Sequence, residues 1–264
     1  MLSLAAGALP EFPPDQIVAA ASEAGFSASG IWCDTKTWTA ATTRAVARRL
    51  RDGGLIPLDI EVVWMGPGRQ VTDDALRLID IGGELGAQNV LIVSANPDPS
   101  ETTQQFAVLC ERAQSAGMRA VLEFLMIAQV RTLAQALEIV TNVGHPAAGL
   151  LIDALHLARC GALPEDVARI PRALLPYAQL CDGAATLHAP DFRAYLADAM
   201  DGRLAPGEGE LPLRELLRAL PETVSLSLEV RSKRHRERFP DPVERARAIL
   251  RATERFLSVE APTG

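Results

Sequence analysis

The sequence predicts an α/β protein with a (β/α)8 TIM-barrel fold. Short apolar runs alternate with helix-like segments along the chain, and eight such runs occur. Alternating βα units favour a parallel sheet with helices outside it, and eight units favour a closed barrel over an open sheet. The length of 264 residues is also typical, because such barrels contain about 250 residues. We therefore expect residues 1–264 to form one TIM-barrel domain.

Glycines, prolines and capping residues mark the limits of these units. Gly25 and Gly144, for example, each follow a helix-like segment, as glycine at a helix C-terminus does. The expected strands are 2–6, 28–32, 55–63, 89–93, 119–124, 148–153, 174–180 and 224–230. The expected helices are 16–24, 41–51, 72–84, 100–116, 132–143, 164–170, 190–200, 211–220 and 241–256, with a frayed tail at 260–264.

Composition narrows the functional classes. The formal net charge is −7, and an acidic chain is a poor partner for nucleic acid or an anionic membrane. The four cysteines show neither C-x-x-C spacing nor a disulfide pattern, which favours a reducing, cytoplasmic setting. No apolar run approaches the roughly 18 residues of a membrane span. We expect a cytoplasmic protein that binds neither nucleic acid nor membrane.

Nucleotide-binding motifs and a Schiff-base lysine are both missing. No G-x-G-x-x-G opens a helix after a strand, and no G-x-x-x-x-G-K-[ST] occurs. The two lysines, Lys36 and Lys233, lie outside the predicted buried strands. A Schiff-base aldolase mechanism, which needs a desolvated lysine, is therefore disfavoured.

Four oxygen-bearing side chains follow or end four consecutive apolar runs. These four candidate ligands are Glu123, Asp153, Gln179 and Glu229. In a TIM barrel the active site lies at the C-terminal ends of the strands, so their side chains are expected to converge. Carboxylate and amide oxygens suit Mg²⁺, Mn²⁺ and related ions, and a dication removes the repulsion between neighbouring carboxylates. A solvated strand end explains one such residue, but four in succession predict a divalent metal site.

Two further polar residues lie beside these positions. His156 comes three residues after Asp153, a spacing that puts both on one side of a helix. His156 is expected either to bind the metal or to hydrogen-bond a substrate oxygen. Arg231 comes two residues after Glu229 and shares its face of a strand, from which it could hold an anionic or hydroxyl group of the substrate. It also begins the basic run 231–238, which is equally consistent with a solvated surface.

The expected pocket around this site is partly apolar. Trp32 and Phe124 fall at the C-terminal ends of predicted strands, where they could contact a partly apolar or aromatic substrate, or stack on a sugar. Packing beneath the loops accounts for them equally well. Glu61, on the third strand, is placed to reach a substrate hydroxyl, and His188, in the long loop after the seventh strand, could cover the pocket.

These features resemble the xylose isomerase-like TIM barrels, the superfamily of sugar phosphate isomerases, epimerases and endonuclease IV. The matching parts are Glu123, Asp153-x-x-His156, Asp182-Gly183, the stretch from Arg203 through Pro206-Gly207-Glu208-Gly209, and Glu229-x-Arg231. The resemblance implies that the four candidate ligands hold one divalent metal ion. Gln179 stands where many relatives have histidine. That difference favours Mn²⁺ or Mg²⁺, with Co²⁺ and Zn²⁺ as alternatives.

The resemblance also implies a mechanism. In the family's epimerases and isomerases two glutamates flank a hydroxy-ketone; one removes a proton from carbon, the other returns it, and the metal stabilises the enediolate. By this resemblance Glu123 and Glu229 are the catalytic pair, and the substrate is a small sugar or hydroxy-ketone. A metal-dependent lyase or dehydratase starts from the same enediolate and remains an alternative.

Two other functions remain to be weighed. A non-catalytic barrel that binds only a metal or ligand is the second alternative. The resemblance to endonuclease IV does not extend to its histidine-rich, three-metal site, because the chain has four histidines, at 145, 156, 188 and 235. Barrels of this kind often pair, so a homodimer is the assembly to test.

Overall fold

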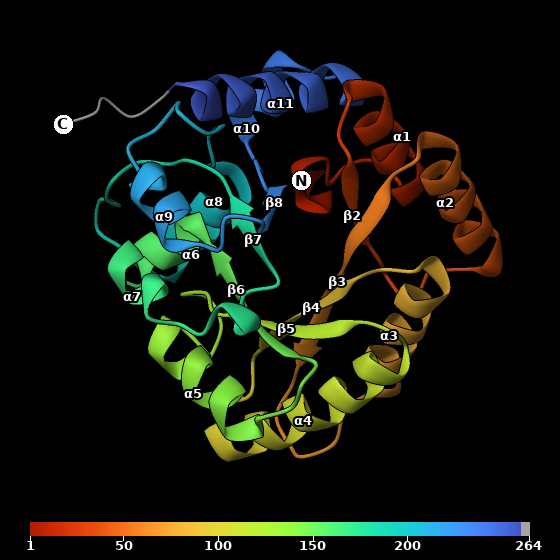
Figure 1. Ribbon diagram of the computed structural model, residues 1–264, viewed down its shortest axis with the longest axis vertical. Helices are drawn as coiled ribbons and strands as arrows, with labels where there is room; N and C mark the ends of the chain where they lie inside the picture. Colours follow the sequence, from red (N-terminus) through yellow and green to blue (C-terminus); the bar gives the residue numbers. More distant parts are fainter. Residues whose placement is uncertain (260–264) are drawn as a thin grey trace.

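The computed structural model describes residues 1–259, which form a closed barrel of eight parallel strands in the order β1 to β8. The strands are β1 Leu2–Leu4, β2 Ala28–Trp32, β3 Ile56–Met65, β4 Asn89–Ser94, β5 Arg119–Glu123, β6 Ala148–Asp153, β7 Tyr177–Leu180 and β8 Ser225–Leu228. Pairing of β8 with β1 closes the barrel. Figure 1 shows the strands at the centre of a ring of helices. The predicted TIM-barrel fold is confirmed.

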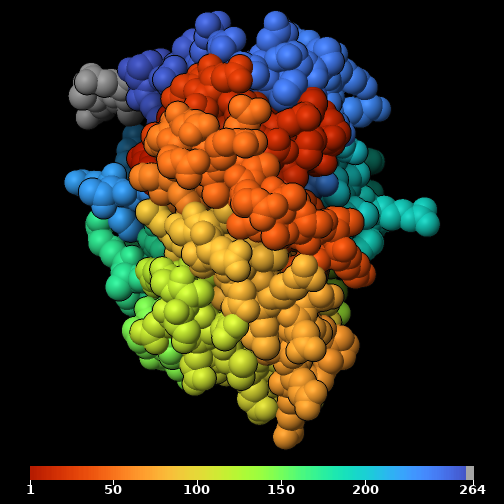
Figure 2. All heavy atoms as spheres, turned by 90° about the vertical axis from the view of Figure 1, so that its right-hand side faces the viewer, coloured from red at the N-terminus to blue at the C-terminus, as the bar shows by residue number. Residues whose placement is uncertain are grey.

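The helices lie outside the strands. They are η1 Ala6–Ala8, α1 Pro14–Ala24, α2 Ala40–Gly53, α3 Asp73–Leu85, α4 Pro99–Ser115, α5 Leu133–Val143, α6 Ala154–Arg159, α7 Pro164–Ala168, η2 Arg172–Leu174, α8 Phe192–Asp201, α9 Leu213–Ala219, α10 Lys233–Arg238 and α11 Pro242–Ser258. Helices α1 and α11 pack side by side, so the red and blue ends of the chain meet in Figure 2. No helix within residues 1–259 has both the length and the apolar character that crossing a membrane requires.

Local signals explain where the helices begin and end. The Thr132 side chain accepts a hydrogen bond from the backbone N–H of Gln135 at the start of α5, and the Gln135 side-chain oxygen accepts one from the backbone N–H of Thr132, which forms a capping box. Gly144 ends the same helix with φ 57°, a left-handed conformation that glycine adopts without steric cost. The predicted limits of this helix are therefore close to those observed.

The hydrophobic core has two layers. The larger layer lies between the strands and the surrounding helices. The smaller layer fills the barrel interior with side chains from β2 to β7 and from the segment after β5: Ala28, Leu58, Leu91, Val93, Val121, Leu125, Ala128, Leu151 and Tyr177. The interior is therefore packed with side chains, as expected for a TIM barrel, and the functional residues lie at its C-terminal end.

Three predicted strands are shorter in the structure by two residues or more. Strand β1 stops at Leu4, because residues 6–8 turn into η1. Strand β7 starts at Tyr177 and not at residue 174, because residues 172–174 form η2 and Pro176 has no N–H to give to a strand ladder. Strand β8 ends at Leu228, so the prediction that Glu229 and Arg231 share a strand face is wrong. Both lie in the segment that follows β8.

The basic run after β8 forms a short helix. Residues 233–238, interpreted from sequence as a solvated surface, form α10. Its residues Lys233, Arg234, Glu237 and Arg238 are exposed, in agreement with that interpretation. The Ser232 hydroxyl caps it by accepting a hydrogen bond from the backbone N–H of His235. The predicted frayed tail at 260–264 lies outside the described residues.

Candidate metal centre

The four candidate ligands come from neighbouring barrel strands. Glu123 is the last residue of β5, Asp153 the last of β6, Gln179 lies in β7, and Glu229 follows the last residue of β8. Asp153 pairs directly with Gln179 in the β6–β7 register. All but Glu229 are classed as buried, and the Glu229 side chain is only 12% exposed. The alternation of strands and helices thus gathers four oxygen-bearing side chains at the C-terminal end of the barrel.

Gln179 joins the two glutamates. Its side-chain amide lies 3.1 Å from a carboxylate oxygen of Glu123 and 3.1 Å from one of Glu229. With its nitrogen turned toward them, the amide donates a hydrogen bond to each carboxylate. With its oxygen turned toward them, three oxygen acceptors meet without a proton between them, which is the arrangement that a cation stabilises. The donor set therefore fits a hard or borderline divalent metal.

A second grouping of possible ligands overlaps the first. One ligand atom from each of Glu123, Asp153 and His156 lies within 4.8 Å of the others, and all three residues are buried. These carboxylate and imidazole atoms are suitable donors for a divalent ion. The residues at this end of the barrel thus offer a carboxylate and histidine group that could hold a metal.

Arg203 is the cation of this cluster. Its Nη1 donates to Oδ2 of Asp153 at 2.6 Å, and its Nη2 lies 3.1 Å from Oε2 of Glu229. Its Nη2 also lies 3.2 Å from Nε2 of His156, and its Nη1 lies 3.2 Å from the sulfur of Cys181. From sequence, Arg203 stood out only as the start of a stretch that resembles the family. The structure places its guanidinium inside the site.

A network of backbone hydrogen bonds holds the loop that carries Arg203. The carboxylate of Asp182, just after β7, accepts bonds from the backbone N–H groups of Gly207 and Leu211 at 3.0 Å each. The backbones of Asp182 and Leu204 exchange two further bonds of 2.8 Å. A Cβ atom at Gly209 would lie 2.5 Å from the Asp182 carboxylate, so only glycine fits there. These contacts fix the position of Arg203.

His156 is held as a neutral acceptor. Its backbone N–H donates to Oδ1 of Asp153 at 2.9 Å, which makes Asp153 the N-cap of α6. Because an arginine can only donate, Nε2 of His156 must accept from Arg203 and the ring proton must lie on Nδ1. Burial lowers the pKa of His156 to about 4. The spacing from Asp153 to His156 therefore serves both the helix cap and the site.

Two buried acids on β3 enlarge the cluster. Neither carboxylate oxygen of Asp59 has a hydrogen-bond partner among residues 1–259, and Oε1 of Glu61 has none either. Burial, reinforced by nearby negative charge, raises the pKa of Asp59 to about 7 and that of Glu61 well above its usual range. Burial also raises the pKa of Glu229 to about 7 and that of Glu123 well above its usual range.

The cluster has an excess of acidic groups that a metal ion could neutralise. Five carboxyl groups face two guanidinium groups, those of Arg203 and Arg231, which leaves an excess of three negative charges if every acid ionises. Asp153 is the exception among the acids: despite burial, Arg203 and its neighbours hold its pKa below the usual range. A bound dication would allow the other acids to ionise.

The remaining predicted pocket residues lie in different environments. Trp32 is 40% exposed and borders a cavity of about 490 Å³, together with Val62 and the 48% exposed Trp64. Arg231 is partly buried, and the charges of Glu229 and Glu61 act on it. His188 is exposed in the loop after β7. Phe124 is fully buried in the core layer between the strands and helices, so it is not part of the exposed rim.

One curated relative matches most of the chain. It is the 3-dehydroshikimate dehydratase of Pseudomonas putida, which is 28% identical over 232 residues. The match covers 82% of this chain and 36% of the relative. The chain therefore spans about a third of the length of the curated relative it matches.

Three solved structures share the fold over their whole length. The IolI protein with a bound zinc atom has a TM-score of 0.80 and is 17% identical in sequence. The match covers 97% of this chain and 98% of the IolI chain. The probable 3-DHS dehydratase AsbF from Bacillus anthracis has a TM-score of 0.74 at 17% identity, and the match covers 96% of this chain and 98% of AsbF. D-Psicose 3-epimerase from Clostridium cellulolyticum H10 has a TM-score of 0.70 at 12% identity, and the match covers 98% of this chain and 99% of the epimerase.

A family model gives the most direct assignment. The model described as "Xylose isomerase-like TIM barrel" matches residues 18–255, which include every helix and strand from α2 to β8 and all four candidate ligands. The three solved structures share this architecture, and two of them are named as a probable dehydratase and an epimerase. The chain belongs to the xylose isomerase-like TIM barrel family.

Proposed function

We propose that this protein is a divalent-metal-dependent enzyme that removes a proton from a carbon next to the carbonyl group of a small hydroxy-ketone. The observation that carries the proposal is the approach of Glu123 and Glu229 to the Gln179 amide, 3.1 Å from each. Two carboxyl groups that meet at the Gln179 amide can act on one substrate, so that one takes a proton from it and the other gives one back. We further propose dehydration as the overall reaction.

The metal would be held by the four candidate ligands. When bound, it supplies positive charge that stabilises the negative charge developing on a substrate oxygen. Arg203 holds Asp153 and Glu229 in place through contacts of 2.6 and 3.1 Å. Burial excludes water from these groups, which strengthens each electrostatic interaction among them.

The proton transfers fall to the two glutamates. Glu229 contacts the Arg203 guanidinium, which favours its ionised form and suits it to act as the base. Glu123 has no ion pair among residues 1–259, so it is the better placed to carry a proton and deliver it to the departing hydroxyl group. In this scheme, the C–H proton goes to Glu229, and the C–O bond breaks as Glu123 protonates the leaving oxygen. The products are an unsaturated ketone and water.

One observation supports dehydration over epimerisation. The curated relative is named as a 3-dehydroshikimate dehydratase, and its identity to this chain is higher than that of the structurally similar epimerase. A ketose isomerase or epimerase remains the second candidate, since it uses the same first proton transfer.

A direct comparison of substrates tests the proposal. Protein loaded with Mn²⁺ or Mg²⁺ is incubated with 3-dehydroshikimate, whose dehydration product is aromatic and absorbs ultraviolet light, and separately with ketohexoses analysed by chromatography. We expect the aromatic product, loss of its formation in Glu123→Gln and Glu229→Gln, and normal rates in Glu84→Gln, an exposed control on α3. Epimerised ketose without aromatic product would refute dehydration and support the second candidate.

A further inference from the structure

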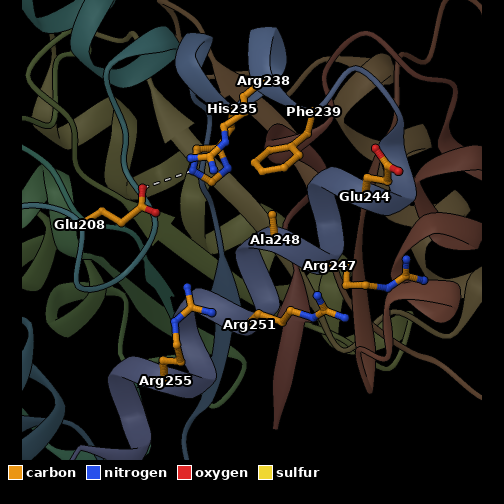
Figure 3. Close-up of a pocket in the computed structure, with 9 residues that line it drawn as sticks. All are labelled: Glu208, His235, Arg238, Phe239, Glu244, Arg247, Ala248, Arg251 and Arg255. Carbon is orange, nitrogen blue, oxygen red and sulfur yellow. Dashed lines mark hydrogen bonds and ion pairs between the residues drawn. The ribbon is translucent and has the colours of Figure 1, made fainter.

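A basic hollow lies on the outer surface, away from the candidate metal centre. It has a volume of about 460 Å³ and is formed by α10, α11 and the loop after Arg203. Figure 3 shows its side chains gathered between these three segments. Its lining residues are Glu208, His235, Arg238, Phe239, Glu244, Arg247, Ala248, Arg251 and Arg255. None of the four candidate ligands lines it, so the two sites are separate.

The hollow gathers positive charge in an acidic protein. Four arginines and two glutamates line it, whereas the chain as a whole has a formal net charge of −7. Glu208 lies 3.3 Å from Nε2 of His235, so one of the two acids already faces a partner. Among residues 1–259, none of the four arginines forms an ion pair with a carboxylate. The four arginines thus outnumber the two glutamates of the hollow, and Arg247 donates a hydrogen bond of 3.0 Å to the backbone oxygen of Glu23.

Three of the four arginines form a row along α11. Arg247, Arg251 and Arg255 follow one another at intervals of four residues, which places them in one stripe on the helix. Like charges at this spacing repel and destabilise a helix. The helix dipole favours cations in the last turn, which accounts for Arg255 but not for the other two. A stripe of this kind is stabilised when an anion binds along it.

We propose that this hollow binds a small anion carrying two or more phosphoryl groups. Planar guanidinium groups donate paired hydrogen bonds that match phosphate oxygens. The stripe from Arg247 to Arg255 spans about 12 Å at 1.5 Å per residue, which is longer than a single phosphate group. The volume lies within the range of about 300–1,000 Å³ that is common for small-molecule sites.

The shape and the wall residues favour a small ligand over a membrane or a nucleic acid. The hollow is concave and local, and the rest of the protein is acidic, which repels extended polyanions. Phe239 adds an apolar wall, and the Arg238 guanidinium lies 5.1 Å from the centre of its ring. A ligand with a phosphorylated end and an apolar or planar part would use both features.

Binding of inorganic pyrophosphate, measured by isothermal titration calorimetry at low ionic strength, tests the proposal. We compare the wild type with the double variant Arg251→Gln/Arg255→Gln. The matched control is Arg44→Gln/Arg48→Gln on α2, which changes two exposed arginines at the same four-residue spacing outside the hollow. We expect the first variant to weaken binding by about tenfold or more, because charge-assisted hydrogen bonds are lost, and the control to bind as the wild type does.

The outcomes distinguish binding in the hollow from nonspecific attraction of pyrophosphate to positive charge. Equal weakening in the two double variants would mean that only net charge matters, and would overturn the proposal. Unchanged binding in Arg251→Gln/Arg255→Gln would place the pyrophosphate elsewhere, including at the metal centre, and would overturn it too. The absence of any binding by the wild type would do the same. Circular dichroism spectra of both variants check that each remains folded.

Discussion

Arg203 and Asp153 form a buried ion pair at the centre of the candidate site, with Nη1 of Arg203 2.6 Å from Oδ2 of Asp153. The side chains are 2% and 0% exposed, and the two residues lie 50 positions apart in the sequence. The same guanidinium reaches Glu229 at 3.1 Å. One arginine thus partly neutralises two acids, and the remaining excess of carboxylates is what a divalent metal would balance.

Removal of this arginine should make stability depend on metal. Arg203→Met leaves Asp153 as a buried charge without its ion-pair partner, and breaking such a pair costs about 3–5 kcal/mol. We expect the variant to unfold at a lower urea concentration than the wild type. Added Mn²⁺ should restore more of the lost stability than it adds to the wild type, because the ion replaces part of the missing positive charge.

A second buried ion pair provides the control for this experiment. Arg159 and Asp198 lie 2.7 Å apart with side chains 4% and 8% exposed, outside the four candidate ligands. Arg159→Met should also lower stability, but Mn²⁺ should affect it no more than the wild type. Equal rescue of the two variants by Mn²⁺ would contradict the role given to Arg203.

Gln179 should control the choice of metal. Replacing it with leucine removes an oxygen donor that lies 3.1 Å from both glutamates, so we expect at least about tenfold weaker Mn²⁺ binding. Gln179→His supplies an imidazole nitrogen and should shift the preference toward Zn²⁺. Calorimetric titration of each variant with Mn²⁺ and Zn²⁺ measures both effects. An unaltered Zn²⁺/Mn²⁺ affinity ratio in Gln179→His would refute this assignment.

Asp59 should make the metal-free protein less stable as pH rises. Burial, followed by the charge of Glu229, raises its pKa from 3.8 to about 7, so the folded state keeps a proton that the unfolded state releases. Stability is therefore lost between about pH 4 and pH 7. The asparagine of Asp59→Asn cannot ionise. The free energy of unfolding of this variant should therefore exceed that of the wild type by up to about 4 kcal/mol at pH 8 and equal it near pH 4.

Urea denaturation at pH 4 and pH 8 measures this difference directly. Both proteins are compared without metal, because a bound cation would favour the ionised form of Asp59. A difference in unfolding free energy that is the same at both pH values would show that Asp59 does not titrate in this range.

Gly209 should be required for the loop that carries Arg203. A Cβ atom there would lie 2.5 Å from both the Asp182 carboxylate and the carbonyl oxygen of Gly183, so Gly209→Ala must displace the loop. We expect a loss of about 1–3 kcal/mol in stability, together with weaker metal binding, since Arg203 would move. Gly66→Ala is the control, because no atom lies within 4 Å of its added Cβ. Thermal unfolding that is unchanged in Gly209→Ala would contradict the prediction.

Sequence patterns were sufficient to predict the barrel. Apolar runs bounded by glycine, proline and capping residues predict the eight strands because parallel strands in a barrel are buried on both faces. The same runs end in Glu123 and Asp153, so two of the four candidate ligands could be placed at strand ends. The limits of β7 and β8 were less accurate, because Pro176 and the turn after Leu228 shorten strands whose apolar pattern continues.

The positions of Arg203 and Asp59 could not be predicted from local patterns. Arg203 reaches Asp153 across 50 residues through a loop held by Asp182, and such long-range contacts have no local signal. Asp59 lies inside an apolar strand and has no partner in residues 1–259, so its burial becomes evident only when the barrel closes. The core position of Phe124, by contrast, could have been predicted, because Phe124 follows Glu123 directly and successive side chains of an extended segment point to opposite sides.

The central claim is that the side chains around Gln179 bind one divalent metal. Its most direct test is the Mn²⁺ stoichiometry of metal-free protein, measured by calorimetric titration for the wild type and for Glu123→Gln. Glu123 forms no ion pair among residues 1–259, so this variant alters the donor set without breaking a salt bridge. One equivalent of Mn²⁺ per chain, lost or greatly weakened in the variant, is the predicted result. Wild-type protein that binds no Mn²⁺, or a variant that binds it equally well, would contradict the claim.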